Sequence, residues 1–201
     1  TSNEIFKHVT GLTLPLALYF HNDEPSPKSL DTTVSISYPE TYHKYMDLKS
    51  LYIKEFTNRN TLNERKIADE QIKYFFDNYI TGGLNRLEKF KTQLSDLLNE
   101  YESIEITIKG FASPLAKSDY NSNLSKRRIS SLVNYFHNVD NGKFKPYINN
   151  GQLIIKSAPF GENKSSNSAS DDYNNTQQSI YSPKAAIERR IEIQEVIFNY
   201  K

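Results

Sequence analysis

The side chain with the clearest chemical consequence in this sequence is an arginine among aliphatic residues. Leu124, Arg128, Leu132 and Phe136 recur every four residues, so a helix would place all four in one row. An apolar row packs against a sheet, where an unpaired guanidinium is costly. Arg128 therefore either reaches the helix edge or pairs with an internal carboxylate, or it binds the carboxylate of a ligand. Arg127 lies about 100° further round the helix, where it can reach solvent or a neighbouring loop.

A strand should precede this helix and present it to the core. Ile104, Ile106 and Ile108 alternate with polar residues, which is the period of a half-buried strand, and Gly110 ends the run. A polar loop over 111–117 then leads into the helix. The strand, the loop and the helix together form the unit that positions Arg128.

Residues 110–136 resemble the second strand, loop and helix of the OmpA-like peptidoglycan-binding domain. The family pattern is approximately G-x-T-D-x-x-G-x-x-x-Y-N-x-x-L-S-x-x-R-A-x-x-V-x-x-Y-L, and seven positions match it without a gap: Gly110, Tyr120, Asn121, Leu124, Ser125, Arg128 and Tyr135. Residues 160–162 (Phe-Gly-Glu) and 188–193 (Glu-Arg-Arg-Ile-Glu-Ile) resemble two later family segments. The resemblance implies an α+β fold with a βαβαββ mixed sheet and helices on one face.

The resemblance also implies a function and a set of ligand-binding residues. Family members bind the peptide stem of peptidoglycan without forming a covalent bond, and the helix arginine receives the carboxylate of diaminopimelate. Arg128 takes that role here, and Asn121 and the 111–114 loop would orient the peptide. The loop contributes Phe111, Ala112, Ser113 and Pro114. The implied setting is the periplasm, where the domain would anchor an outer-membrane or secretion assembly to the cell wall.

One departure from the family pattern affects the binding site. Ser113 stands where most members carry the aspartate that receives the ligand ammonium, and Ala112 and Ala116 replace a threonine and a glycine. This G-x-A-S-P variant is similar to a branch that includes a peptidoglycan-anchoring component of the type IX secretion system. Asn22 and Asp23, after the first strand, fit the place that borders the ligand pocket. Asp23 is the first candidate to replace the missing acid, although a lone loop aspartate is commonly a turn or cap residue.

The rest of the chain predicts one domain over 1–201 with two additions. Residues 12–20 form an apolar strand, with Pro15 near its start, and 84–98 form an amphipathic helix. Between them, we interpret a helical hairpin over 38–80 as an insertion. Each of its two helices begins with a capping box, and Gly82-Gly83 is expected to end the second helix. Its aromatic stripe is assigned to packing in the core. Residues 163–182 are polar and low in complexity, which predicts a flexible loop. Further strands are expected at 153–155 and 191–196.

Composition and motifs argue against several other classes of protein. The chain has no Cys, and its 25 basic and 24 acidic residues give a net charge of +1, which would not attract nucleic acid. The four histidines are scattered and Asp171-Asp172 lacks calcium-loop spacing, so no metal or other cofactor is expected. No nucleophile motif is present and no enzyme activity is expected. The longest apolar runs fall short of a membrane span.

Two interpretations remain open from the sequence. The first is a peptidoglycan-binding anchor, supported by Arg128, Tyr120 and Asn121. The second is a protein-interaction scaffold that kept the fold and lost the ligand, supported by Ser113 and by the large insertion. A chain that begins at Thr1, without Met or a signal-like segment, also predicts a mature or excised fragment.

Overall fold

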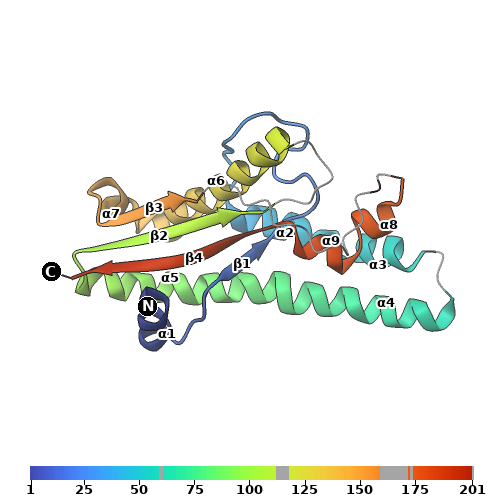
Figure 1. The fold of residues 1–201 in the computed structure, drawn as a ribbon, viewed down its shortest axis with the longest axis horizontal. Helices are drawn as coiled ribbons and strands as arrows, with labels where there is room; N and C mark the ends of the chain where they lie inside the picture. Colours follow the sequence, from blue (N-terminus) through green and yellow to red (C-terminus); the bar gives the residue numbers. More distant parts are fainter. Residues whose placement is uncertain (59–60, 112–117, 159–171, 173, 201) are drawn as a thin grey trace.

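A four-stranded mixed sheet runs along the molecule (Figure 1). The computed structural model describes residues 1–58, 61–111, 118–158, 172 and 174–200. The strand order is β1-β4-β2-β3; β4 is antiparallel to β1 and β2, and β2 is parallel to β3. The bounds are β1 Leu16–Tyr19, β2 Ser103–Gly110, β3 Leu153–Ser157 and β4 Arg190–Asn199. The predicted α+β class and mixed sheet are therefore confirmed.

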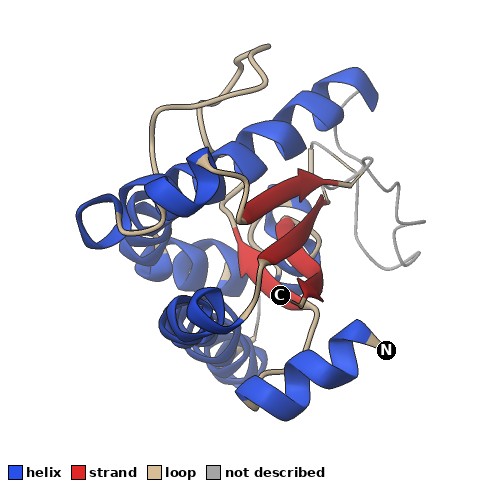
Figure 2. Cartoon of the chain, turned by 90° about the vertical axis from the view of Figure 1, so that its left-hand side faces the viewer, coloured by secondary structure: helices blue, strands red, loops and turns tan. Residues whose placement is uncertain are grey.

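One face of this sheet carries the core. In β2 the residues Ile104, Ile106 and Ile108 are fully buried while their neighbours are half-buried, as the alternation predicted. The register places Ile193 of β4 between Ile108 and Leu16, so the buried row continues across the sheet. Figure 2 shows the longer helices gathered on one side of the strands. The C-terminus lies near the end of the sheet where β2 begins, opposite the end where β2 leads to α6 (Figure 1). The N-terminal helix lies beside the middle of β4, where Asn3 Nδ2 donates to the carbonyl of Gln194 at 3.0 Å.

The described helices lie in four stretches of the chain: before β1, between β1 and β2, between β2 and β3, and between β3 and β4. Their bounds are α1 Ser2–Thr10, α2 Tyr38–Asp47, α3 Lys49–Thr57, α4 Leu62–Tyr74, the π-helical segment η1 Phe75–Thr81, α5 Gly82–Glu100, α6 Ser118–Gly142, α7 Lys145–Asn149, α8 Thr176–Ser179 and α9 Pro183–Ile187. Both predicted capping boxes are present. The backbone N–H of Ser37 donates to Glu40 at 2.8 Å, and that of Thr61 donates to Glu64 at 2.8 Å.

The predicted helix break at Gly82-Gly83 is wrong. The chain continues from α4 through η1 into α5 as one rod (Figure 1). Gly83 is needed for a close approach to β1, because a Cβ at this position would lie 2.9 Å from the carbonyl oxygen of Ala17. Gly82 has ordinary space around it, with Arg86 Nη1 at 3.5 Å. Gly83 therefore allows close packing of a helix on a strand, and the glycine pair does not end the helix.

Two segments contain helices that the sequence analysis did not assign. Near the N-terminus, α1 begins at a Thr1–Glu4 capping box and ends at Gly11 with φ of 66°. Half of the predicted loop over 163–182 lies outside the described residues, and within the described half Thr176–Ser179 is helical. Asn175 caps α8, and Ser182 caps α9 with Pro183 in its first turn.

The predicted first strand is shorter than expected, and the aromatic stripe packs as expected. β1 covers only Leu16–Tyr19, directly after Pro15. Tyr45 and Tyr52 are almost fully buried, and their rings lie 5.4 and 5.3 Å from that of Phe76.

Among the described helices, none has an apolar stretch long enough to cross a bilayer.

Candidate functional site: a buried arginine between two loops

The guanidinium of Arg128 lies where β1, β2 and α6 meet. It is fully buried. Its Nε donates to the carbonyl of Glu24 at 3.0 Å, Nη1 donates to that of Phe111 at 2.9 Å, and Nη2 donates to that of His21 at 3.5 Å. The guanidinium also lies over the ring of Phe20, 5.3 Å from its centroid. Arg128 therefore joins the loop after β1 to the end of β2 through main-chain oxygens.

The glycine that ends β2 permits this arrangement. A Cβ on Gly110 would lie 2.7 Å from the Cβ of Ser125, closer than side chains tolerate. Because α6 approaches the strand end this closely, the Arg128 side chain, one turn further along, can reach the Phe111 carbonyl. The close packing of α6 on the end of β2 thus requires small residues at Gly110 and Ser125, two positions of the sequence motif.

Arg127 is also fully buried, on the other side of the helix row. Its Nε donates to the carbonyl of Pro25 at 3.0 Å, and its Nη1 donates to those of Ser29 at 2.6 Å and Asp31 at 3.0 Å. Of the two options that the sequence left open, solvent or a loop, the structure shows the loop.

Asp23 is held by groups of the protein itself. One carboxylate oxygen accepts a hydrogen bond from the Tyr120 hydroxyl, and the other accepts from the backbone N–H of Lys28 at 3.0 Å. The Tyr120 hydroxyl in turn accepts from Lys28 N at 3.0 Å and from Arg127 Nη2 at 3.3 Å. Burial and the bond to Asp23 raise the pKa of Tyr120. Asp23 thus behaves as the turn residue that the sequence offered as the simpler alternative.

The remaining predicted site residues divide into two groups. Asn121 is buried and Asn22 is half-buried, while Phe111 is buried with the Arg190 guanidinium 4.4 Å from its ring centroid. Glu24 is half-buried beside Arg128, and burial raises the pKa of its carboxyl. Ala112, Ser113 and Pro114 lie outside the described residues, as do residues 160–162 and Asp171.

A buried polar chain extends from Arg128 towards α8. The His21 ring nitrogen Nδ1 is 2.8 Å from the Tyr52 hydroxyl, to which Arg189 Nη2 donates at 3.2 Å. Arg189 is almost fully buried and also donates to the carbonyls of Ser179 and Ile180, at 3.3 and 2.6 Å. Burial, and then the charges of Arg189 and Arg128, lower the pKa of His21 to about 4. The sequence analysis missed this chain because its members lie far apart in the sequence.

Three buried guanidinium groups thus share one region with few carboxylates. Among the described residues, none of Arg127, Arg128 and Arg189 forms an ion pair. Burial, and then the charge of Arg189, lower the pKa of Arg128 to about 9. An anion placed at Arg128 would raise this pKa again, because it would favour the charged form of the guanidinium.

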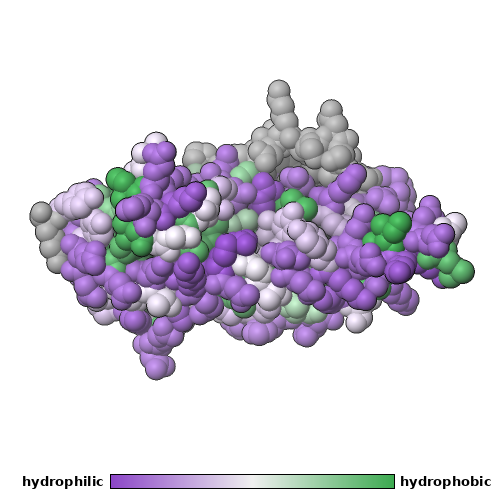
Figure 3. All heavy atoms as spheres, turned by 90° about the horizontal axis from the view of Figure 1, so that it is seen from below, coloured by the Kyte–Doolittle hydropathy of each residue, from purple (hydrophilic) through white to green (hydrophobic). Residues whose placement is uncertain are grey.

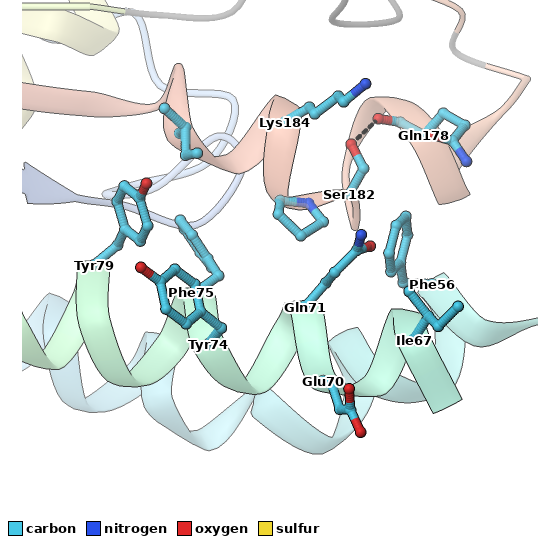
Figure 4. Close-up of a pocket in the computed structure, with 12 residues that line it drawn as sticks. Phe56, Ile67, Glu70, Gln71, Tyr74, Phe75, Tyr79, Gln178, Ser182 and Lys184 are labelled. Carbon is cyan, nitrogen blue, oxygen red and sulfur yellow. Dashed lines mark hydrogen bonds between the residues drawn. The ribbon is translucent and has the colours of Figure 1, made fainter. Parts of the chain in front are cut away.

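A concave region lies beside the α8–α9 segment. It is a mainly apolar groove of about 690 Å³ between α4 with η1 and the α8–α9 segment. Figure 4 shows Phe56, Gln71 and Phe75 directed towards α9. The rest of its lining consists of Ile67, Glu70, Tyr74, Tyr79, Gln178, Ser182, Pro183, Lys184 and Ile187. Figure 3 shows apolar side chains exposed over this end of the molecule, where Leu62 and Ile67 of α4 are exposed.

Neither region holds the donor set of a metal centre. In the part of the chain that the structure describes, no three His, Asp or Glu side chains converge. Comparison with known proteins gives no match to a family model, to a curated protein or to a solved structure. The likeness to the OmpA-like domain therefore rests on the sequence pattern of residues 110–136, 160–162 and 188–193 alone.

Proposed function

We propose that the chain binds the peptide stem of peptidoglycan non-covalently and thereby anchors an outer-membrane or secretion assembly to the cell wall in the periplasm. The observation that carries this proposal is the Arg128 guanidinium, fully buried where the loop after β1 meets the end of β2 and without an ion-pair partner among the described residues. A buried cation of this kind would be stabilised by an anion beside it. Diaminopimelate, the residue implied by the motif around Arg128, supplies a carboxylate.

In this proposal Arg128 receives the ligand carboxylate through its Nη2 edge. The contact of Nη2 with the His21 carbonyl is 3.5 Å, the longest of the three carbonyl contacts and therefore the weakest hydrogen bond. Exchanging the His21 carbonyl for a ligand carboxylate at Nη2 thus costs less than the same exchange at Nε or Nη1. A charge-assisted bond to a carboxylate is about twice as strong as a bond between neutral groups. Asn121 and the 111–114 loop orient the peptide.

The ligand ammonium is proposed to lie at Asp23. Both oxygens of this carboxylate already accept a hydrogen bond, but each has a second lone pair. Asp23 therefore keeps the capacity to accept an ammonium without losing Tyr120 or Lys28. Glu24, half-buried beside Arg128, is the alternative acceptor.

A protein-interaction scaffold is the second candidate, and one observation favours it. Arg128 has three main-chain acceptors, which is an arrangement that a purely structural arginine would also show. In that case the apolar groove at α4 and α9 would be the better candidate for a contact surface.

Co-sedimentation with purified peptidoglycan sacculi tests the proposal. The protein should pellet with sacculi at low salt, and a free stem peptide containing diaminopimelate should release it. A matched stem peptide with the diaminopimelate carboxylate amidated is the control, and it should compete poorly because it cannot pair with Arg128. Failure to pellet at low salt would favour the scaffold.

A further inference from the structure

A second row of polar side chains runs along α6, beside the apolar row that faces the sheet. Its spacing alternates between three and four residues, so all its members lie on one helix face. The row consists of Tyr120, Asn123, Arg127, Ser130 and Asn134. This polar row meets the connection over 21–37, which has no helix or strand of its own.

The polar row supplies the hydrogen bonds that this connection lacks within itself. Asn123 Nδ2 donates to the carbonyl of Leu30 at 3.0 Å, and Asn134 Nδ2 donates to those of Val34 at 2.6 Å and Ile36 at 3.1 Å. With Arg127 donating to three more carbonyls, the connection is fixed along its length by side chains of one helix. Backbone groups that were left unpaired on burial would be costly, so the row accounts for the order of this segment.

Arg127 binds the part of the connection that is hardest to order. Three non-glycine residues there adopt positive φ: Asp23 at 59°, Ser26 at 59° and Lys28 at 62°. Such a backbone is sparsely populated by free chains and persists only when its surroundings hold it. The acceptors of Arg127 at residues 25, 29 and 31 lie among and just beyond these positions.

The same stretch carries two of the three carbonyls that fix the Arg128 guanidinium, those of His21 and Glu24. Adjacent arginines on one helix therefore divide the work: Arg127 orders the loop, and the loop orients Arg128. We propose that Arg127, assisted by Tyr120, is the positioning residue of the Arg128 site and sets ligand affinity without touching the ligand. The part concerning affinity rests on the proposed function; the part concerning the loop does not.

The test compares three variants of the whole chain by two measurements. Arg127→Gln removes the guanidinium, and Tyr120→Phe removes only the hydroxyl that holds Asp23 and therefore should fold even where Arg127→Gln does not. Asn134→Ala is the matched control, because it also removes two bonds to carbonyls of the same connection, at residues 34 and 36, away from Arg128. The measurements are amide hydrogen exchange over 22–32 without ligand, and competition of a diaminopimelate stem peptide for sacculi.

Arg127→Gln should speed exchange over 22–32 by about tenfold or more and weaken the stem peptide by a similar factor. Tyr120→Phe should act in the same direction with a smaller factor. Asn134→Ala should speed exchange only near 33–37 and leave binding unchanged. Parent-like exchange over 22–32 in both Arg127→Gln and Tyr120→Phe would overturn the inference, as would an equal loss of binding in Asn134→Ala. If the parent itself does not bind sacculi, the proposed function fails, and the exchange measurement still decides whether Arg127 orders the loop.

Discussion

Two regions of the described part of the chain are candidates for contact with a partner, and they differ in the groups that they present. The arginine region, comprising Arg127, Arg128 and the 21–31 loop, contains buried charge and many fixed hydrogen bonds. The groove between α4 and α9 is an open space of about 690 Å³ with a mainly apolar wall. The arginine region presents charge and hydrogen-bonding groups with fixed directions, whereas the groove presents a concave apolar surface.

This difference shows why volume alone is a weak guide to function. An apolar groove lowers its free energy by covering surface of almost any apolar partner, so it gives little selectivity. A buried guanidinium selects for an anion, because few other groups compensate its desolvation. These arguments favour the proposal that a ligand is recognised in the arginine region, and they leave the groove as the proposed contact surface of the alternative function.

The largest expected effect is a loss of stem-peptide binding on substitution in the arginine region but not in the groove. Arg128→Ala should weaken stem-peptide binding by roughly thirty-fold or more, since losing one partner of a buried charged contact costs about 2 to 5 kcal/mol. Arg128→Lys should fail nearly as badly, because an ammonium does not reproduce the planar fork. Tyr74→Ser, in the groove, is the control and should bind like the parent.

Competition for sacculi measures these affinities, and circular dichroism checks folding. An Arg128→Ala protein that stays folded and binds like the parent would show that the arginine serves only the fold. Loss of binding in Tyr74→Ser would instead move recognition to the groove.

A smaller effect should appear in the acid stability of the arginine region. The pKa of His21 is lowered to about 4 from an ordinary value near 6.5, so the unfolded chain takes up its proton first as pH falls. Stability from this group is fully present above pH 6.5 and is lost progressively down to about pH 4, with a total of about 3 kcal/mol.

Urea denaturation at several pH values measures this loss. His21→Gln should flatten the slope between pH 6.5 and 4. His43→Gln, at an exposed histidine of α2, should leave it unchanged. Equal slopes in the parent and in His21→Gln would place the acid sensitivity elsewhere.

The smallest effects should come from two glycines with opposite surroundings. Gly110→Ala should destabilise the protein by about 1 to 3 kcal/mol, because its Cβ would meet Ser125 in the arginine region. Gly82→Ala, at the start of α5, should stabilise by about 0.5 to 1 kcal/mol, because alanine is the better helix former and has space there. Chemical denaturation of both variants measures the pair, and a stabilising Gly110→Ala would contradict the close approach of α6 to β2.

The sequence predicted those features that repeat with a fixed period. The alternation around Ile106 located β2, and the four-residue spacing around Arg128 correctly placed that side chain against the sheet. Capping boxes located the starts of α2 and α4 because the Ser or Thr and the Glu are close in sequence. Local rules suffice where both partners of an interaction are local.

Features that depend on distant partners were missed or misread. Gly83 was taken for a helix break because the approach of Ala17 cannot be seen from the sequence. The polar row containing Asn123 and Asn134 has the pattern of a solvated helix face, yet it binds a loop about a hundred residues away. Arg128 was expected at the helix edge, beside a carboxylate or beside a ligand, and its carbonyl acceptors were not anticipated because any residue type can provide them.

The placement of the C-terminus has a mechanical consequence. It lies at one end of the sheet, and Arg128 contacts the residue that follows β2 at the other (Figure 1). A pull between the C-terminus and the ligand that we propose for Arg128 would run roughly along β2 and β4. Such a load acts in shear, so it stretches all the hydrogen bonds between these antiparallel strands at the same time. It does not break them one after another from one end. The sheet therefore has the geometry of a tether that resists tension along its long axis.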